Sequence, residues 1–248
     1  MLKFKSFFLS FVFFTTTFIL ADLASEEELY TGKEFQSAFA NPQDNPELPN
    51  VLLIGDSISI GYTLSVRKEL KDKADVYRIS TNGRHTEFGL ANIEKWLGKL
   101  GNKEFDVIHF NWGLWDICYR NPEATTQGKR DKVHGTLTTT PEDYKKNLES
   151  IVERLQKTGA KLIWCATTPV PENEIGRKVG DEVKYNLIAE AIMLKEGVAI
   201  NDLHTYANQS LPTIQKLNGD VHFTSEGSAY LAKQVVKTIL EQLAVKSK

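Results

Sequence analysis

A serine near the start of the sequence and a histidine near its end have the residue types and settings of a nucleophile and its base. Ser57 lies in the segment GDSI (residues 55–58), after an apolar run and before a stretch with helical periodicity. The amino end of a helix there would supply N–H groups to the negative oxygen that forms when a serine attacks a carbonyl. The nucleophile also needs a base, because a serine hydroxyl is not ionised at neutral pH. His222 in GDVHF (residues 219–223) is the candidate base, and Asp220 is the nearest carboxylate.

These residue types also have a structural interpretation. Asp and Ser are common N-caps of helices, so Ser57 alone is as compatible with capping as with catalysis. His109 lies inside an apolar run and is interpreted as a core histidine. The other three histidines lie in expected loops without a comparable carboxylate motif beside them: His85, His134 and His204.

The elements that must position these side chains alternate between strands and helices. Five short apolar runs without polar alternation predict parallel strands covered on both faces: residues 51–55, 75–80, 107–111, 161–166 and 198–202. One of the intervening helices is predicted to begin with Thr140 as N-cap and Pro141 at its first position. The alternation predicts an α/β protein, a three-layer α/β/α sandwich with a five-stranded, mainly parallel sheet. Binding sites in such sheets lie at the carboxyl ends of the strands, where Ser57 is expected.

The segments outside this alternation predict an exported protein. Residues 1–24 are interpreted as a secretory signal peptide, because two lysines precede an apolar run over residues 7–20 and small residues follow it. An uncleaved membrane anchor is the alternative. Residues 25–49 are acidic and then rich in Pro, Asn and Gln, which indicates an arm crossing the surface. Residues 50–248 are expected to form one domain, which is secreted or periplasmic and has no stable membrane association after signal cleavage.

Charge and cysteine content exclude some partners and cofactors. A net charge of −2 argues against nucleic acid as a partner, because binding to phosphates needs an excess of basic residues. Cys118 and Cys165 have no metal-ligand spacing, and no other cluster of His, Cys and carboxylates has it, so no metal or organic cofactor is expected. Cys165 lies within an apolar run, where a buried thiol is the usual outcome.

Together these features resemble the SGNH (GDSL-like) hydrolase family over nearly all of the chain after residue 24. The family has a GDS motif after its first strand, matched at residues 55–57, and a histidine near its carboxyl end, matched by His222. After its second strand it has a glycine whose N–H joins the oxyanion hole, and Gly83 in STNGR matches this glycine. The resemblance implies a flavodoxin-like fold, Ser57 as nucleophile, and the N–H groups of Ser57 and Gly83 as oxyanion donors.

The third block of the family departs from its usual pattern in this sequence. The family has Gly-x-Asn-Asp after its third strand, whereas residues 113–116 read GLWD and Trp115 stands where the asparagine is expected. Because the loss of one oxyanion donor costs roughly a hundredfold or more in rate, we expect a replacement. Asn111, two residues before the glycine, is predicted to be this donor. The alternative is a strand-end asparagine that caps the following loop.

The last block departs as well. The family has Asp-x-x-His, but Gly219 lies three residues before His222 and the nearest carboxylate is Asp220, two residues before it. Asp220 is predicted to be the acid that orients the imidazole, which requires the loop to turn differently. The alternative is a Ser–His dyad in which a backbone carbonyl fixes the tautomer of His222.

The resemblance implies an ester hydrolase that works through an acyl-enzyme, without cofactor. The predicted substrate is a small-molecule or carbohydrate ester, and Arg84, His85 and Trp115 are the residues predicted to contact it. The altered blocks leave an alternative open, in which the same fold binds carbohydrate or performs acyl transfer or sugar elimination.

Overall fold

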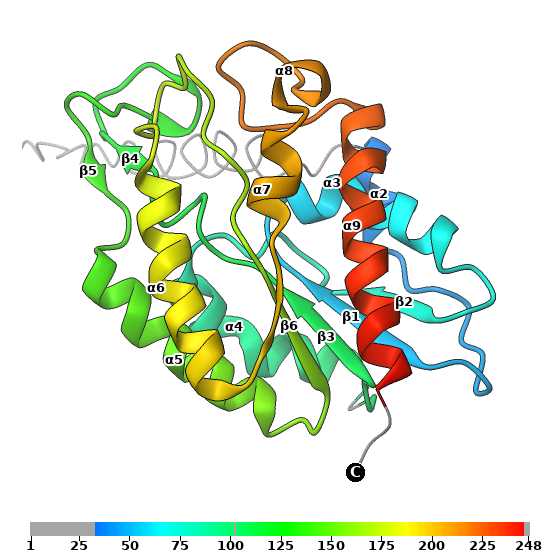
Figure 1. Ribbon diagram of the computed structural model, residues 1–248. Coiled ribbons are helices and arrows are strands. Elements are labelled where there is room, and N and C mark those ends of the chain that lie inside the picture. The colour runs from blue at the N-terminus through cyan, green and yellow to red at the C-terminus, as the bar shows by residue number, and fades with distance from the viewer. Residues whose placement is uncertain (1–32, 102, 246–248) are drawn as a thin grey trace, which may run out of the picture.

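A parallel β-sheet with the strand order β2-β1-β3-β6-β7 forms the centre of the computed structural model (Figure 1). The structure describes residues 33–101 and 103–245, so the predicted signal peptide and the first part of the arm lie outside the described residues. The strands are β1 (Asn50–Ile54), β2 (Asp75–Arg78), β3 (Val107–Phe110), β6 (Lys161–Cys165) and β7 (Ala199–Asn201). All five predicted strands are therefore confirmed, with ends that differ by one or two residues.

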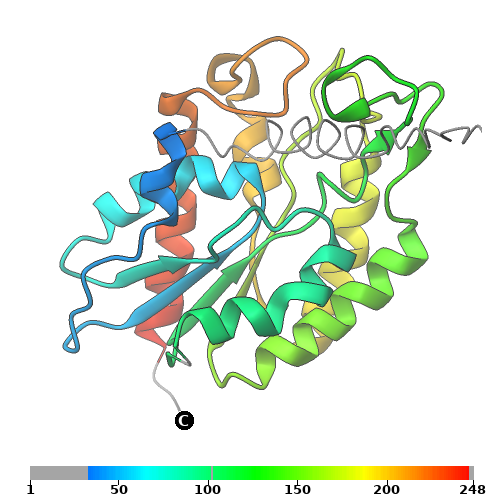
Figure 2. The ribbon, with the colours of Figure 1, turned by 180° about the vertical axis from the view of Figure 1, so that it is seen from behind.

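Helices cover both faces of this sheet (Figures 1 and 2). One face carries α2 (Lys33–Phe39), α3 (Ser57–Glu69), α7 (Leu203–Asn208) and α9 (Ser225–Ala244). The other face carries α4 (Thr86–Lys99), α5 (Pro141–Gln156) and α6 (Asp181–Glu196). In Figure 2, α4 and α5 lie in front of the sheet, and α6 packs beside α5. The short helix α8 (Leu211–Ile214) connects α7 to the loop before α9. The predicted α/β/α sandwich is thus confirmed.

The strand order places a topological switch point between β1 and β3. The chain leaves β1 toward one face through α3, and it reaches β3 from β2 along the opposite face through α4. Ligand sites of doubly wound sheets form where the connections diverge in this way. Ser57 begins α3 directly after β1, so the fold places it at this point.

Side-chain caps begin α3, α9 and α5. Asp56 is the N-cap of α3 and accepts a hydrogen bond from the Ile58 N–H at 3.0 Å. Thr224 caps α9, just after His222, and accepts from the Gly227 N–H at 2.9 Å. Thr140 caps α5, as predicted from the sequence. Each cap satisfies an N–H group that lacks an acceptor within its helix.

The sheet and the inward faces of the helices form the hydrophobic core. The apolar stripe of α5 is completely buried: Tyr144, Leu148, Ile151, Val152 and Leu155. The core histidine is also confirmed, since His109 is completely buried in β3 and lies 3.0 Å from Asn201 Nδ2. Cys118 and Cys165 are both buried, free thiols. In the described part of the chain, no helix is both long and apolar enough to cross a membrane.

One element was not predicted. A small antiparallel pair, β4 (Tyr119–Arg120) and β5 (Thr136–Leu137), closes the long loop between β3 and α5. Its strands are two residues long and half-exposed, so no apolar pattern marks them in the sequence. The pair holds the polar segment 121–135, which includes the turn η1 (Gln127–Lys129), beyond the carboxyl ends of the strands (Figure 1).

Candidate active site

Ser57, His222 and Asp220 form a chain of hydrogen bonds at the carboxyl edge of the sheet. Ser57 Oγ lies 2.9 Å from His222 Nε2, although 165 residues separate the two in the sequence. His222 Nδ1 in turn lies 2.6 Å from Asp220 Oδ1. With the proton on Nδ1, the imidazole presents Nε2 as an acceptor toward the serine hydroxyl, as a general base must.

The loop before α9 explains how a carboxylate two residues before the histidine reaches the imidazole. Asp220 Oδ1 also accepts a hydrogen bond from the His222 backbone N–H at 3.1 Å, so the same carboxylate oxygen contacts both the backbone and the side chain of His222. Gln215 Nε2 donates to the Asp220 carbonyl at 2.8 Å. Gly219 begins the turn with φ of 78°, in the left-handed region, and a Cβ there would lie 2.8 Å from the Asn173 carbonyl oxygen. The loop thus has a turn that brings a carboxylate two residues before the histidine into contact with the imidazole.

The surroundings of Asp220 favour its ionised form. Burial raises the pKa of this carboxyl, but the hydrogen bond from His222 and the charges of His222 and Arg130 outweigh it and lower the pKa from its usual value. The side chains of His222 and Asp220 are 19% and 24% exposed, so both can be reached from solvent. Ser57 is only 5% exposed.

A buried arginine contacts the turn that carries Ser57. Arg78 at the end of β2 is 1% exposed, and its Nη2 donates to the Gly55 carbonyl at 3.0 Å and to Ser59 Oγ at 2.8 Å. It also lies 3.3 Å from the Asp56 carbonyl. Burial lowers the pKa of Arg78 to about 10, which still leaves it charged at neutral pH. The sequence analysis missed this residue, because nothing in a short apolar strand marks an arginine as inward-facing.

Gly83 packs against this turn, but its N–H does not point to an oxyanion. The Gly83 N–H donates to the Gly55 carbonyl at 2.9 Å, and a Cβ on Gly83 would lie 2.9 Å from the same oxygen. The predicted role of Gly83 as an oxyanion donor therefore needs correction, since its hydrogen is already engaged. Gly83 instead allows the loop after β2 to approach the turn at Gly55–Ser57 closely.

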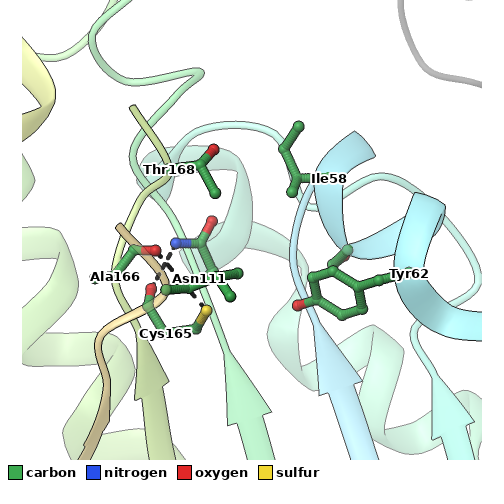
Figure 3. A pocket seen from close by; sticks show the side chains of 8 residues that line it. Ile58, Tyr62, Asn111, Cys165, Ala166 and Thr168 are labelled. Carbon is green, nitrogen blue, oxygen red and sulfur yellow. Dashed lines mark hydrogen bonds between the residues drawn. The ribbon is translucent and has the colours of Figure 1, made fainter. Parts of the chain in front are cut away.

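Asn111 likewise uses its amide for another purpose. Asn111 Nδ2 donates to the Cys165 carbonyl at 2.6 Å and lies 3.4 Å from Thr167 Oγ1, both at the end of β6 (Figure 3). It borders a cavity of about 10 Å³, just large enough for one water molecule, with Ile58 and Thr168 on the other sides. This geometry argues against Asn111 as an oxyanion donor. The asparagine is at a strand end, as in the alternative, but its side chain joins β3 to the end of β6 and does not cap the loop that follows β3.

A different asparagine has an amide donor without a partner. Asn82 follows β2, directly before Gly83, and is 1% exposed. Its Oδ1 accepts from the Arg84 N–H at 2.9 Å, whereas its Nδ2 has no hydrogen-bond partner within residues 33–101 and 103–245. A buried amide donor without an acceptor is costly unless a ligand or water completes it. The only sign of Asn82 in the sequence was its position directly before Gly83, the glycine that matches the family after the second strand.

The three predicted substrate residues have contacts of their own within the fold. Arg84 Cζ lies 4.6 Å from the centre of the Phe88 ring. His85 is the N-cap of α4 and accepts from the Phe88 N–H at 3.4 Å. Trp115 is half-buried under Arg120, whose Cζ lies 4.8 Å from the centre of its ring. Contacts of these residues with substrate stay a prediction.

A buried ion cluster in the loops above the site was also missed. Glu174 is completely buried and binds both Arg177, at 2.9 Å, and Arg130, at 3.2 Å. Arg177 Nε donates to the Leu114 carbonyl at 2.6 Å, which joins the loop after β6 to the loop after β3. Charged residues in long polar loops look solvent-exposed in a sequence, so only the fold identifies this cluster.

Two further contacts join the loops after β2 and β3. Trp112 Nε1 donates to the Gly83 carbonyl at 3.0 Å. The buried Asp116 accepts from the N–H and the hydroxyl of Thr86 at 2.9 and 2.6 Å. Among the described residues, no group of three or more His, Cys, Asp or Glu side chains could hold a metal ion.

Replacing Arg78 by Met is expected to slow the reaction of Ser57 with a fluorophosphonate by about tenfold or more. Methionine fills similar space but releases the Gly55 and Asp56 carbonyls, and misplacement of a nucleophile by about 1 Å can cost ~10²-fold in rate. The rate of covalent labelling and the melting temperature are both measured. Unchanged labelling in a folded Arg78→Met protein would contradict this positioning role.

Asp116 is expected to make stability depend on pH. Burial raises the pKa of this carboxyl from 3.8 to about 7, so the folded protein holds the proton more tightly than the unfolded chain. The free energy of unfolding should therefore fall as pH rises from about 4 to about 7. The Asp116→Asn variant has no carboxyl group to ionise, so it should not lose this stability. The free energy of unfolding of the variant minus that of the unmodified protein should therefore increase between pH 5 and pH 8, as measured by urea unfolding. Parallel pH profiles for the two proteins would show that Asp116 ionises normally.

Several solved structures share this fold, although the sequence matches no family model and the comparison with curated proteins found no match. An acetyl xylan esterase aligns with a TM-score of 0.61 and 19% identity, over 77% of this chain and 99% of that protein. A lipase/acylhydrolase from Enterococcus faecalis aligns with a TM-score of 0.59 and 20% identity, over 81% and 98%. An acetylxylan esterase from Geobacillus stearothermophilus aligns with a TM-score of 0.57 and 15% identity, over 80% and 95%. At these identities the likeness concerns the fold, and the chain has the fold of the SGNH (GDSL-like) hydrolases, as the resemblance predicted.

Proposed function

We propose that this protein is a serine ester hydrolase with Ser57 as nucleophile, His222 as base and Asp220 as the acid. The observation that carries the proposal is the hydrogen-bonded chain of the three side chains, with separations of 2.9 and 2.6 Å. The proposal is supported by the fold, which this chain shares with esterases and acylhydrolases. A binding protein with a diverged site would have no need for an aligned nucleophile, base and acid.

In the proposed reaction, Ser57 Oγ attacks the acyl carbonyl and His222 Nε2 takes the hydroxyl proton. The tetrahedral intermediate collapses as His222 returns this proton to the oxygen of the leaving alcohol, and an acyl-enzyme remains. Water then attacks the acyl-enzyme, again with His222 as base, and releases the carboxylic acid and Ser57. Asp220 holds the Nδ1 proton of the imidazole and stabilises the imidazolium in both steps.

We propose that the Ser57 N–H and Asn82 Nδ2 hold the oxyanion. Ser57 occupies the first turn of α3, where N–H groups have no acceptor within the helix and the helix dipole is positive. Asn82 brings a buried amide donor from the loop that packs against the nucleophile turn through Gly83. This pair replaces the donors that sequence reasoning placed at Gly83 and Asn111.

Acylated carbohydrate is the proposed substrate class, and the protein is proposed to be exported. Two of the structures with this fold are esterases of acetylated xylan by name. The signal-peptide pattern of residues 1–24, which lie outside the described residues, supports a secreted or periplasmic enzyme.

The nucleophile is tested by covalent labelling and by turnover of a short aryl ester. A fluorophosphonate should label Ser57, and Ser57→Ala should abolish both labelling and turnover, because no other group carries the acyl intermediate. Ser150→Ala, in the middle of α5, is the matched control and should keep both. An active Ser57→Ala protein, or an unmodified protein that is neither labelled nor active, would overturn the proposal.

Asn82 is tested by two substitutions. Asn82→Ala should lower kcat for the aryl ester by roughly 10²- to 10³-fold, the usual cost of one oxyanion donor, with a smaller change in KM. Asn82→Asp keeps the Oδ1 acceptor for the Arg84 N–H but lacks the donor, and should lose at least as much. If Asn82→Asp keeps its activity, Asn82 supports the loop and does not hold the oxyanion.

A further inference from the structure

A cavity of about 270 Å³ lies at the outer edge of the sheet, beside the edge strand β2. Its walls come from the arm at the end of α2, from the end of β2 and the residues that follow it, and from the end of α4. None of Ser57, His222 and Asp220 lines it, so it is separate from the candidate active site. Its volume lies just below the range of about 300 to 1,000 Å³ that is usual for drug-sized ligands, so it suits a small molecule.

Arg78 is the buried part of this wall. It is 1% exposed, and its hydrogen bonds to described residues all come from Nη2, which is directed to the turn between β1 and α3. Nε and Nη1 have no hydrogen-bond partner within residues 33–101 and 103–245. Buried N–H groups of a charged side chain are costly without an acceptor. One side of the guanidinium is thus held by the turn, and the other side lacks an acceptor.

The charged groups in the wall are positive. Arg78 and Lys99 line the cavity, and no carboxylate of the described residues does. The acceptors of Arg78 Nη2 are two carbonyls and a hydroxyl, which are neutral. The charge of Asp56 acts on Arg78, but the Asp56 carboxylate accepts from the Ile58 N–H and forms no ion pair with Arg78 within the described ranges. An anion would therefore complement this wall.

The rest of the wall is apolar or neutral. The Phe39 ring covers a face of the guanidinium, with its centre 5.5 Å from Arg78 Cζ, and this stacking leaves the N–H groups, which lie in the guanidinium plane, available to an acceptor. Trp96 and Leu100 add apolar surface at the end of α4. The exposed Asn41 and Ser80 add an amide and a hydroxyl. The wall thus fits a ligand with one anionic group and a small hydrocarbon part.

We propose that this cavity is a binding site for a small organic carboxylate. The carboxylate accepts hydrogen bonds from the unpartnered side of Arg78, and the hydrocarbon part packs against Phe39 and Leu100. The site goes beyond the proposed function, because it contains none of the groups that cleave the ester. It is nevertheless joined to them, since Nη2 of the same arginine binds the Gly55 carbonyl, two residues before Ser57.

Benzoate and benzamide test the charge of the ligand, because they have nearly the same shape and only benzoate is charged. Binding to the full chain is measured by calorimetry, which needs no turnover, so the result does not depend on the proposed ester hydrolysis. Benzoate should bind about tenfold or more tightly than benzamide, and added salt should weaken only benzoate. Equal affinities, or no binding of benzoate at millimolar concentrations, would overturn the proposal.

Charge variants assign the binding to this cavity. Lys99→Glu and Asn41→Glu each place a carboxylate at the cavity from a different element, and each should weaken benzoate by about tenfold through repulsion between like charges. Lys233→Glu changes an exposed residue of α9, on the opposite face of the sheet, and should leave the affinity unchanged. Unchanged affinity in both cavity variants would show that benzoate binds elsewhere, for example as a product beside Ser57, and would contradict the proposal.

Arg78→Met removes the buried donors and should abolish benzoate binding. The melting temperature shows whether this variant is folded, and a folded Arg78→Met protein that still binds benzoate would refute the role of Arg78. If the variant does not fold, the Lys99→Glu and Asn41→Glu affinities decide the question, because both changes are at exposed positions.

Discussion

The candidate site depends on a charge that is buried beneath Ser57, the proposed nucleophile. Arg78 reaches from the end of β2 to the carbonyls of Gly55 and Asp56 and to Ser59 Oγ, so one guanidinium holds both ends of the turn between β1 and α3. Burying such a charge costs free energy, which these contacts of Nη2 offset in part, since Nε and Nη1 have no hydrogen-bond partner within the described residues. These bonds tie the position of Ser57 to the edge strand of the sheet, and Gly83 closes the same turn from the next loop.

Around this turn, the loops after the strands are joined by buried polar contacts. Trp112 and Asp116 connect the loop after β3 to the loop after β2, and Asn111 connects it to the end of β6. The Glu174–Arg177 pair anchors the loop after β6 over this edge. Buried polar groups of this kind are stable only when their partners are in place, so the loops form the site as one unit. A rigid unit can hold a nucleophile, its base and an oxyanion donor in a fixed relation.

Much of the fold and part of the site could be predicted because their signals are local. Apolar runs mark the five strands, caps mark the helix starts, and the GDS segment after the first strand marks Ser57. The roles given to Gly83 and Asn111 failed for a shared reason. Gly83 lies where the family pattern places a donor, and Asn111 lies four residues before such a position, but each N–H group has found an acceptor in another segment of the chain. Hydrogen bonds between distant segments leave no periodicity in a sequence.

The sequence by itself determined the layered sheet, the place of Ser57 at its carboxyl edge, and the choice of His222 as the partner of that serine. These follow from hydrophobic periodicity and from residue types in fixed order along the chain. Only the tertiary structure decided that Asp220 reaches the imidazole, that Asn82 carries the available amide donor, and that Arg78 supports the nucleophile turn. The physical reason is that hydrogen bonds depend on distances and directions of a few tenths of an ångström, which arise only when separate loops meet at the edge of the sheet.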